Sequence, residues 1–312
     1  MSLQSINPAT QRLLKTLAYH TDEELENILA GAAAAFQSWR RTSFAERTAL
    51  MLACAGILEN EAPRYAQTIS LEMGKPLQQA LGEVKKCATA CRYYAEKAET
   101  FLADENIHTA AAKSFISFEP LGAVLAIMPW NFPYWQVFRF AAPALMAGNV
   151  ALLKHASNVP QCALDLEEIF RRAGFPPGVF TSLLVPTEKI TPLIQDDRIQ
   201  AVTLTGSEGA GSKVAEAAGR AIKKTVLELG GSDPFIILAD ADLDKAVETA
   251  VNSRMINTGQ SCIAAKRFLV EAAVADSFLA KMKALMQAKK PAIPYRTTAI
   301  SVPWPAKTWL RV

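Results

Sequence analysis

The sequence has little net charge and few cysteines. Its formal net charge is +3 over 312 residues, which gives no reason to expect nucleic acid or a membrane as a partner. The five cysteines are odd in number and lack the spacing of a disulfide framework, which fits free thiols in a reducing compartment. The first residues have neither the basic start nor the apolar core of a signal peptide. We therefore expect a cytoplasmic protein.

Two other patterns could suggest a metal site or a membrane span, and both have a simpler interpretation. Cys87 and Cys91 lie four residues apart without a nearby histidine or Cys-x-x-Cys pair, so packing within a helix is favoured and no metal is expected. Residues 121–153 contain a single charge, Arg139, but prolines interrupt the apolar run. Buried strands joined by a helix are therefore favoured over a membrane span.

The periodicity of apolar residues indicates an α/β fold. Residues 22–104 place apolar positions three and four apart, as in amphipathic helices, and residues 105–120 change to short β-like pieces. From residue 122 onward, apolar strands alternate with helices, which indicates a parallel sheet covered on both faces. We expect strands at 122–128, 150–154, 181–185, 201–205, 225–229 and 234–238, and helices after Pro133, at 162–172, from Ser207, at 242–255 and at 275–288.

Cys262 and Glu228 are a candidate nucleophile and a candidate general base. Cys262 ends the polar stretch Asn-Thr-Gly-Gln-Ser-Cys, which favours an accessible thiol at a cleft. Glu228 lies in Leu-Glu-Leu-Gly-Gly, where the two glycines let backbone approach a ligand. The alternatives are a buried structural thiol and an ordinary salt-bridged carboxylate at a strand end.

Four separated motifs, in the expected order, resemble those of the aldehyde dehydrogenase superfamily. They are Trp-Asn-Phe-Pro at 130–133, Lys154 with the Thr-Gly-Ser turn at 205–207, Glu-Leu-Gly-Gly at 228–231 and the Cys262 loop. The resemblance implies a Rossmann-like parallel-sheet cofactor domain and an incomplete α/β catalytic domain of the aldehyde dehydrogenase fold. It assigns residues 1–104 and 121–230 to the NAD(P)-binding domain, 105–120 to an oligomerisation β segment, and 231–288 to the partial catalytic domain.

The resemblance also implies a mechanism of aldehyde oxidation. Cys262 attacks the aldehyde to give a thiohemiacetal, whose oxyanion takes hydrogen bonds from the side-chain amide of Asn131 and the backbone amide of Cys262. Hydride transfer to a nicotinamide leaves a thioester, and Glu228 activates the water that hydrolyses it. The alternative for Asn131 is a turn between two prolines.

The cofactor implied is NAD or NADP. Lys154 and Ser207 match positions that contact the adenosine ribose and phosphate, and Gly206 precedes a helix whose free amides can hold a pyrophosphate. Trp130 is placed beside them, with a buried aromatic as its alternative. Ser157 stands where the family commonly has glutamate, whose charge would repel a 2′-phosphate, so NADP should be accepted.

The substrate implied is a small aldehyde, with succinate semialdehyde favoured. Arg139 lies eight residues after Asn131, at the offset where succinate-semialdehyde dehydrogenases have an arginine that holds the substrate carboxylate. An arginine packed beside the substrate tunnel is the alternative. His155 is interpreted as a surface or turn residue.

The last residues change character abruptly. Residues 289–312 contain four prolines and no acidic residue, so we interpret them as an aberrant tail and hypothesise a frameshifted gene. The family motifs expected downstream are absent from this sequence, and with them the region that would complete a homo-oligomer. A truncated, catalytically inactive fragment that retains at most nucleotide binding is therefore the alternative to an active enzyme.

Overall fold

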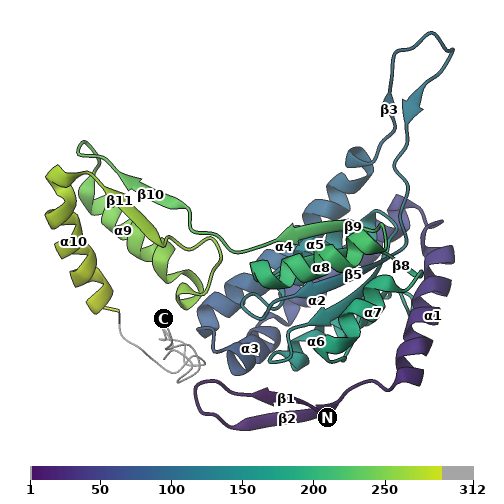
Figure 1. Ribbon diagram of the computed structural model, residues 1–312, viewed down its shortest axis with the longest axis horizontal. Helices are drawn as coiled ribbons and strands as arrows, with labels where there is room; N and C mark the ends of the chain where they lie inside the picture. The colour runs from purple at the N-terminus through teal and green to yellow at the C-terminus, as the bar shows by residue number, and fades with distance from the viewer. Residues whose placement is uncertain (1, 290–312) are drawn as a thin grey trace.

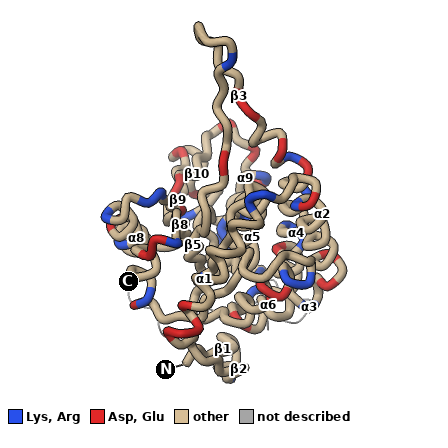
Figure 2. Tube along the Cα trace, turned by 90° about the vertical axis from the view of Figure 1, so that its right-hand side faces the viewer, with Lys and Arg blue, Asp and Glu red and all other residues tan. Residues whose placement is uncertain are grey.

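The computed structural model describes residues 2–289 and has two lobes (Figure 1). The large lobe, residues 2–230, is built around a five-stranded sheet, and the small lobe, residues 234–287, has two strands and two helices. In the view of Figure 2, acidic and basic residues are interspersed along the described chain. This distribution agrees with the small net charge of +3.

The central sheet of the large lobe is parallel throughout, and its strand order is β7-β6-β5-β8-β9. Its strands are β5 Ala123–Met128, β6 Val150–His155, β7 Phe180–Ser182, β8 Ile199–Thr205 and β9 Lys224–Glu228. Nearly every residue of β5 and β6 is buried, as expected for strands covered on both faces. The predicted α/β fold is confirmed, although the predicted strand at 181–185 begins one residue earlier and ends at Ser182.

Helices connect the successive strands of this sheet. They are α5 Trp135–Met146, α6 Pro160–Arg172, the short pair η1 Thr187–Lys189 and α7 Ile190–Gln195, and α8 Glu208–Arg220. Helix α6 begins two residues before the predicted start because Pro160 fits the first helical turn, where its missing N–H is not needed. Strands β5 and β6 with α5 between them account for the apolar run 121–153, as predicted. No helix within residues 2–289 has the length and apolar character that a membrane crossing requires.

Four helices precede the sheet in sequence; the first packs on the sheet itself, and the other three pack on one another and on α5 and α6. They are α1 Asp22–Trp39, α2 Phe44–Asn60, α3 Ala62–Met73 and α4 Leu77–Phe101. Thr21 and Ser43 begin α1 and α2 with capping boxes, each bonded reciprocally to a glutamate three residues on. Gly74, with φ of 77°, ends α3 in the left-handed conformation that glycine adopts readily. The predicted helical region 22–104 is thereby confirmed.

Two hairpins lie at the margins of the large lobe. The N-terminal one pairs β1 Ser2–Ile6 with β2 Leu13–Ala18, and no pattern in the sequence predicted it. Only Leu3 and Ser5 of β1 are buried and β2 is mostly exposed, so neither strand shows apolar alternation. The second hairpin pairs β3 Glu105–Asn106 with β4 Phe115–Ile116 and projects away from the lobe (Figure 1). Its strands are shorter than the predicted β pieces, and its role in oligomerisation stays a prediction.

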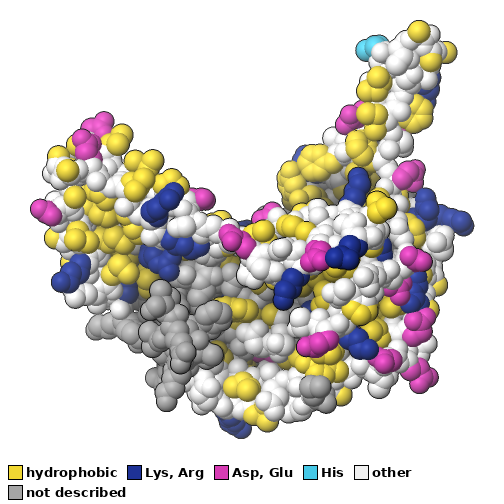
Figure 3. Space-filling model, viewed as in Figure 1, with side chains coloured by type: hydrophobic (Ala, Val, Ile, Leu, Met, Phe, Trp, Pro, Cys, Tyr) yellow, Lys and Arg dark blue, Asp and Glu magenta, His cyan; other side chains and the backbone are white. Residues whose placement is uncertain are grey.

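The small lobe is a parallel strand pair with two helices. It consists of β10 Pro234–Ile237, α9 Leu243–Met255, η2 Ile256–Gly259, β11 Arg267–Val270 and α10 Ala272–Gln287. Its hydrophobic core is a small cluster formed by the buried residues Ile237, Val247, Ala250 and Phe278. Ile236, Leu269 and Leu279 are exposed, and Figure 3 shows hydrophobic side chains across this face. Apart from Lys289, the predicted aberrant tail 289–312 lies outside the described residues.

Candidate active site

Several candidate residues gather at one edge of the five-stranded sheet. The register places Ile127 of β5 opposite both Lys154 of β6 and Leu204 of β8. Leu204 in turn pairs with Leu227 of β9, the residue before Glu228. Three strand spacings of about 4.8 Å separate Lys154 from the β9 end, so about 14 Å of this edge lies between them. The direction of strand addition reverses between β5 and β8, and ligands of such sheets bind at that point.

Cys262 is the exposed thiol of the molecule. All five cysteines lie within the described residues, and the other four are buried. Burial raises the pKa of Cys54, Cys87 and Cys162 well above the ordinary thiol value, which makes them poor nucleophiles. The accessible position of Cys262 favours the nucleophile over the structural thiol. Within residues 2–289 no group of three or more His, Cys, Asp or Glu is arranged to hold a metal ion.

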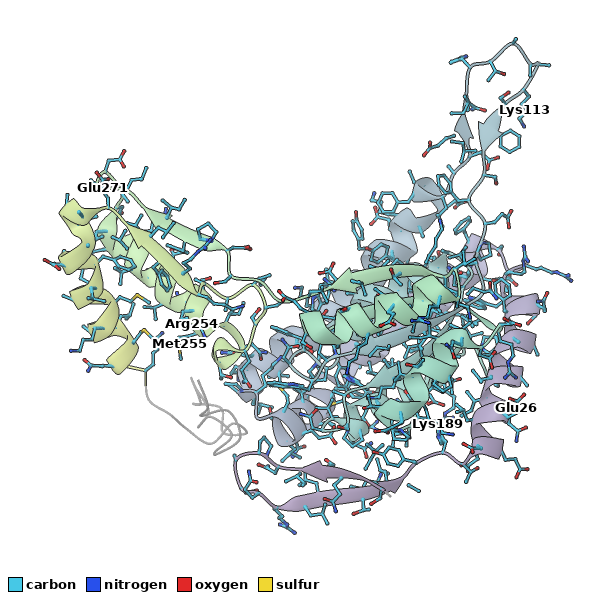
Figure 4. All side chains as sticks on the ribbon, in the orientation of Figure 1. Glu26, Lys113, Lys189, Arg254, Met255 and Glu271 are labelled. Atoms are coloured by element: carbon cyan, nitrogen blue, oxygen red, sulfur yellow. The ribbon has the colours of Figure 1, made fainter. Side chains whose placement is uncertain are left out.

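The loop before Cys262 has an unusual backbone that side chains hold in place. Asn257, Thr258 and Gly259 have φ of 52°, 56° and 81°, and the left-handed region is unfavourable for a β-branched threonine. Arg254 donates from Nη2 to the Gly259 carbonyl at 3.1 Å and from Nη1 to the Ala265 carbonyl at 3.2 Å. Figure 4 labels Arg254 near the end of α9. The guanidinium therefore bonds the Cys262 loop, residues 257–265, at one position before the cysteine and one position after it.

Hydrogen bonds also connect the Cys262 loop to the segment that follows β9. Lys266 Nζ donates to the carbonyl of Cys262 at 2.9 Å and to the carbonyl of Gly231 at 2.6 Å. Because Gly231 follows Glu228 by three residues, this lysine links the two candidate catalytic motifs. The backbone amide of Cys262 has no acceptor among the described residues, so it is free to serve as an oxyanion donor.

Asn131, in the large lobe, forms hydrogen bonds with the Cys262 loop. Its Nδ2 donates to the carbonyl of Gln260 at 2.8 Å, and Asn257 Nδ2 donates to the carbonyl of Asn131 at 2.6 Å. A side-chain amide carries two hydrogens, so one N–H of Asn131 remains after the bond to Gln260. The reciprocal bonds place Asn131 close to the Cys262 loop, which the turn interpretation alone does not require.

A cleft of about 520 Å³ lies between the lobes beside Cys262. Phe132, Trp135 and Arg139 line it from the large lobe, and Met255 and Ile263 line it from the small lobe. Aromatic and aliphatic side chains share the lining with polar and charged ones, most of the charged ones basic, which suits a small organic ligand with a negatively charged end. Arg139 is the predicted substrate-binding residue that the structure places in this cleft together with Cys262.

Glu228 lies on the other side of Arg139. The carboxylate is about half exposed and forms an ion pair with Arg139, with Oε2 at 3.6 Å from Nη1. Arg139 Nη2 also donates to Thr205 Oγ1 at 3.3 Å. Glu228 and Arg139 line a neighbouring cavity of about 450 Å³, to which Cys262 does not contribute. The structure thus brings Arg139 to both catalytic candidates, but it does not bring Cys262 and Glu228 into one cavity.

The residues predicted to bind the cofactor lie at the same sheet edge. Lys154, near the end of β6, is partly buried, and this burial lowers the pKa of its ammonium group. The ammonium makes no hydrogen bond or ion pair within the described part of the chain, although holding it there costs desolvation. An unpartnered cation in this position fits a ligand rich in hydroxyl and phosphate oxygens.

The start of α8 provides backbone donors for a phosphate. Ser207 is the N-cap residue, and its side chain accepts from the amide of Ala210 at 3.3 Å. The amides of Glu208 and Gly209 belong to the first turn, where no intrahelical acceptor exists. The Gly206 amide donates to the Glu228 carbonyl at 2.9 Å, so this glycine joins the ends of β8 and β9. These groups fit a pyrophosphate.

Three more residues near this edge differ in burial. Trp130 is partly buried and packs against the main core, while Ser157 is exposed two residues beyond β6. His155 was predicted to be a surface or turn residue, and this prediction is wrong. Its imidazole is buried, with Nε2 bonded to the Pro133 carbonyl at 2.8 Å and Nδ1 accepting from the Ala156 amide at 2.8 Å.

Sequence reasoning missed a buried ion pair that borders the Cys262 cleft. Lys75 and Glu83 form this pair, and both side chains are 1% exposed. A signal for it exists in the sequence, because Glu83 lies on the apolar stripe of α4 between Ala80 and Cys87. A carboxylate at such a position needs a buried partner.

Comparison with known proteins identifies relatives of this chain. The sequence profile described as aldehyde dehydrogenase family matches residues 1–300. A probable NADP+-dependent succinate-semialdehyde dehydrogenase of Synechocystis sp. is 56% identical over 298 residues, covering 96% of this chain and 66% of the relative. A succinate-semialdehyde dehydrogenase of Mycobacterium leprae, also named as NADP+-dependent, is 54% identical over 290 residues, which cover 92% of this chain and 64% of the relative. Among solved structures, a Streptococcus pyogenes succinic semialdehyde dehydrogenase in complex with NADP+ matches with a TM-score of 0.93 and 38% sequence identity. The match covers 95% of this chain and 66% of that protein. The chain thus spans about two thirds of these relatives.

Proposed function

Because the chain belongs to the aldehyde dehydrogenase family, we propose that it serves the NADP-dependent oxidation of succinate semialdehyde to the dicarboxylic acid. The observation that carries the proposal is one cleft lined by both an exposed thiol, Cys262, and a guanidinium, Arg139. The thiol suits attack on a carbonyl, and the guanidinium suits a carboxylate at the other end of the same small molecule. The names of the relatives point to the same substrate and cofactor.

Cys262 and Asn131 act first in the proposed reaction. The thiolate adds to the aldehyde carbon, and the carbonyl oxygen becomes an oxyanion. The remaining N–H of Asn131 and the free amide of Cys262 donate to that oxyanion, and their strength comes from being fixed before the charge forms. The loop contacts of Arg254 and Asn257 hold both donors in place.

Glu228 acts second, as the base for the water that cleaves the thioester. Its ion pair with Arg139 holds the carboxylate at the guanidinium, in the cavity to which Cys262 does not contribute. A substrate carboxylate bound to Arg139 competes for the guanidinium and releases Glu228. Arg139 therefore has two proposed roles: it binds the substrate carboxylate, and it keeps Glu228 paired until that carboxylate is bound.

NADP is the proposed cofactor, and when bound it accepts the hydride that leaves the substrate. Lys154 would hold the adenosine ribose, the first turn of α8 after Ser207 would hold the pyrophosphate, and Trp130 would border the site. The unpartnered ammonium of Lys154 and the first-turn amides support this assignment. Ser157 leaves room, without charge repulsion, for a 2′-phosphate.

Assembly and location are proposed on simpler grounds. Ile107, Phe115, Ile116 and Phe118 expose apolar surface on the projecting hairpin. We infer that this hairpin serves contact between copies of the chain, as exposed apolar surface commonly does. The cytoplasm is the proposed compartment, because it keeps an exposed catalytic thiol reduced.

Steady-state kinetics of the purified chain test the proposal directly. We expect NADPH formation with succinate semialdehyde and none from a Cys262→Ser variant. Calorimetric titration with NADP separates this result from the alternative of a chain that only binds nucleotide, since the cofactor residues all lie in the large lobe. Binding without turnover would support that alternative, and the absence of both would contradict the site.

A further inference from the structure

Glu83 reaches from α4 into the first turn of α5. Its Oε1 accepts the backbone N–H groups of Tyr134 at 2.9 Å and Trp135 at 3.0 Å. Its Oε2 bonds the ammonium group of Lys75, and both side chains are 1% exposed. One carboxylate thus joins two backbone amides to a buried cation.

Among the described residues, the backbone amides of Tyr134 and Trp135 have no acceptor other than Glu83. The N-cap residue of α5 is Tyr134, which provides no side-chain cap of its own. Tyr134 is fully buried, so without Glu83 its amide would lack both protein and solvent acceptors. Glu83 is therefore a helix cap supplied from another helix, and its negative charge suits the positive end of α5.

The capped segment lies between two proposed functional residues. Asn131 lies three residues before Tyr134, and Arg139 lies one turn after Trp135 on the same helix. Lys75 adds a second contact, because its ammonium nitrogen is 4.0 Å from the centre of the Phe132 ring. The pair consequently contacts the segment from Phe132 to Trp135 through two backbone amides and the ring of Phe132.

Stability alone gives little reason for an ion pair in this place. Replacing a buried pair with apolar residues of similar size is often neutral or stabilising, because desolvation offsets the attraction. Lys75, Glu83 and Phe132 also border the cleft that contains Cys262. On the basis of the proposed function, we infer that Glu83, with Lys75 as its counterion, is a positioning residue that fixes Asn131 and Arg139 for the reaction at Cys262.

Two neutral double variants separate positioning from charge burial. Lys75→Gln/Glu83→Gln, the amide pair, keeps an acceptor for the two backbone amides, whereas Lys75→Met/Glu83→Met, the apolar pair, removes it. Both delete the buried charges, and thermal melting confirms whether each variant folds. Hydrogen exchange then measures protection of the Tyr134 and Trp135 amides directly.

We expect the amide pair to keep both amides protected and kcat within about threefold of the parent chain. In the apolar pair the two amides should exchange faster, and kcat should fall roughly tenfold to a hundredfold, as expected when a catalytic group shifts by about 1 Å. KM for NADP should stay unchanged, since neither variant touches Lys154 or Ser207. Equal kcat in two folded double variants would overturn the positioning role.

A third variant serves if the apolar pair does not fold. Glu83→Asp keeps the charge opposite Lys75 but withdraws the carboxylate by one methylene from the two amides. We expect a lower kcat with faster exchange of Tyr134, and an unchanged kcat would overturn the inference. If the parent chain shows no turnover, the proposed function fails by itself. The exchange rates then decide the claim about Glu83, because protection that survives in the apolar pair refutes it.

Discussion

His155 should make the stability of the protein fall steeply below neutral pH. Burial is the main cause that lowers the pKa of this imidazole from 6.5 to about 4, and the neighbouring Lys154 charge lowers it further. Bonds to backbone carbonyls, such as that of Pro133, raise the pKa in part, whereas the N–H of Ala156 faces the ring nitrogen that a second proton would occupy. Nδ1 already accepts from the Ala156 amide, so Nε2 carries the hydrogen and donates to the Pro133 carbonyl. Protonation of Nδ1 would set two N–H groups against each other.

The sign of the effect follows from the lowered pKa of the folded state. Above pH 6.5 the imidazole is neutral in both the folded and the unfolded chain, and its contribution to stability is fully present. As the pH falls from 6.5 towards 4, the unfolded chain takes up the proton first and folding becomes less favourable. A shift from 6.5 to about 4 corresponds to about 3 kcal/mol in total. By pH 5 the free energy of unfolding should have lost about 2 kcal/mol.

Urea unfolding of the parent chain and a His155→Gln variant, measured from pH 7.5 to pH 4.5, tests this reasoning. Gln can still donate to the Pro133 carbonyl but does not titrate. Other groups, such as Glu61, whose pKa Arg172 lowers to about 2 by hydrogen bonding, titrate alike in both proteins and cancel. His108→Gln in the exposed hairpin is the matched control and should follow the parent curve. If parent and His155→Gln curves stay parallel, the buried histidine does not titrate as described.

Three further predictions concern binding and catalysis. Lys154→Ala should weaken NADP binding about tenfold or more in calorimetry, since a charge-assisted bond is lost; Lys223→Ala should have less effect, because Lys223 already bonds a backbone carbonyl at 2.5 Å. Ser157→Glu should lower the NADP-to-NAD ratio of kcat/KM about tenfold by repelling the 2′-phosphate, and an unchanged ratio would remove Ser157 from cofactor selection. Arg139→Ala should raise KM for succinate semialdehyde roughly tenfold to a hundredfold more than KM for a neutral aldehyde of similar length, whereas equal losses would indicate a packing role.

The parallel sheet and the place of its ligand edge were predictable because each depends on local patterns. Strands β5 and β6 are apolar along their whole length, which is required of strands covered on both faces. The alternation of strands and helices then fixes a parallel order, and the carboxyl ends of the strands meet at one edge. Lys154 and Ser207 could therefore be assigned to that edge from the sequence.

The buried polar contacts were not predictable, since each depends on residues far apart in the chain. His155 follows the predicted strand 150–154 and precedes turn-forming residues, so the sequence places it at the surface, whereas in the structure it is the last residue of β6. The carbonyl of Pro133, which makes its burial possible, lies 22 residues earlier. Glu83 and Tyr134 are likewise 51 residues apart. Periodicity detects which face of a helix is apolar, but not which polar atom a distant segment will satisfy.

Arg139 shows why the two interpretations of that residue from sequence are compatible. A guanidinium has five N–H donors in a planar fork, and here it uses them on Thr205 and Glu228 while still bordering the Cys262 cleft. Packing beside the cleft is what keeps the charge within reach of a substrate carboxylate. In the proposed reaction one cation serves both the substrate carboxylate and the base, so a substrate without a carboxylate would leave Glu228 paired. Selectivity for charged aldehydes would then arise in hydrolysis of the thioester as well as in binding.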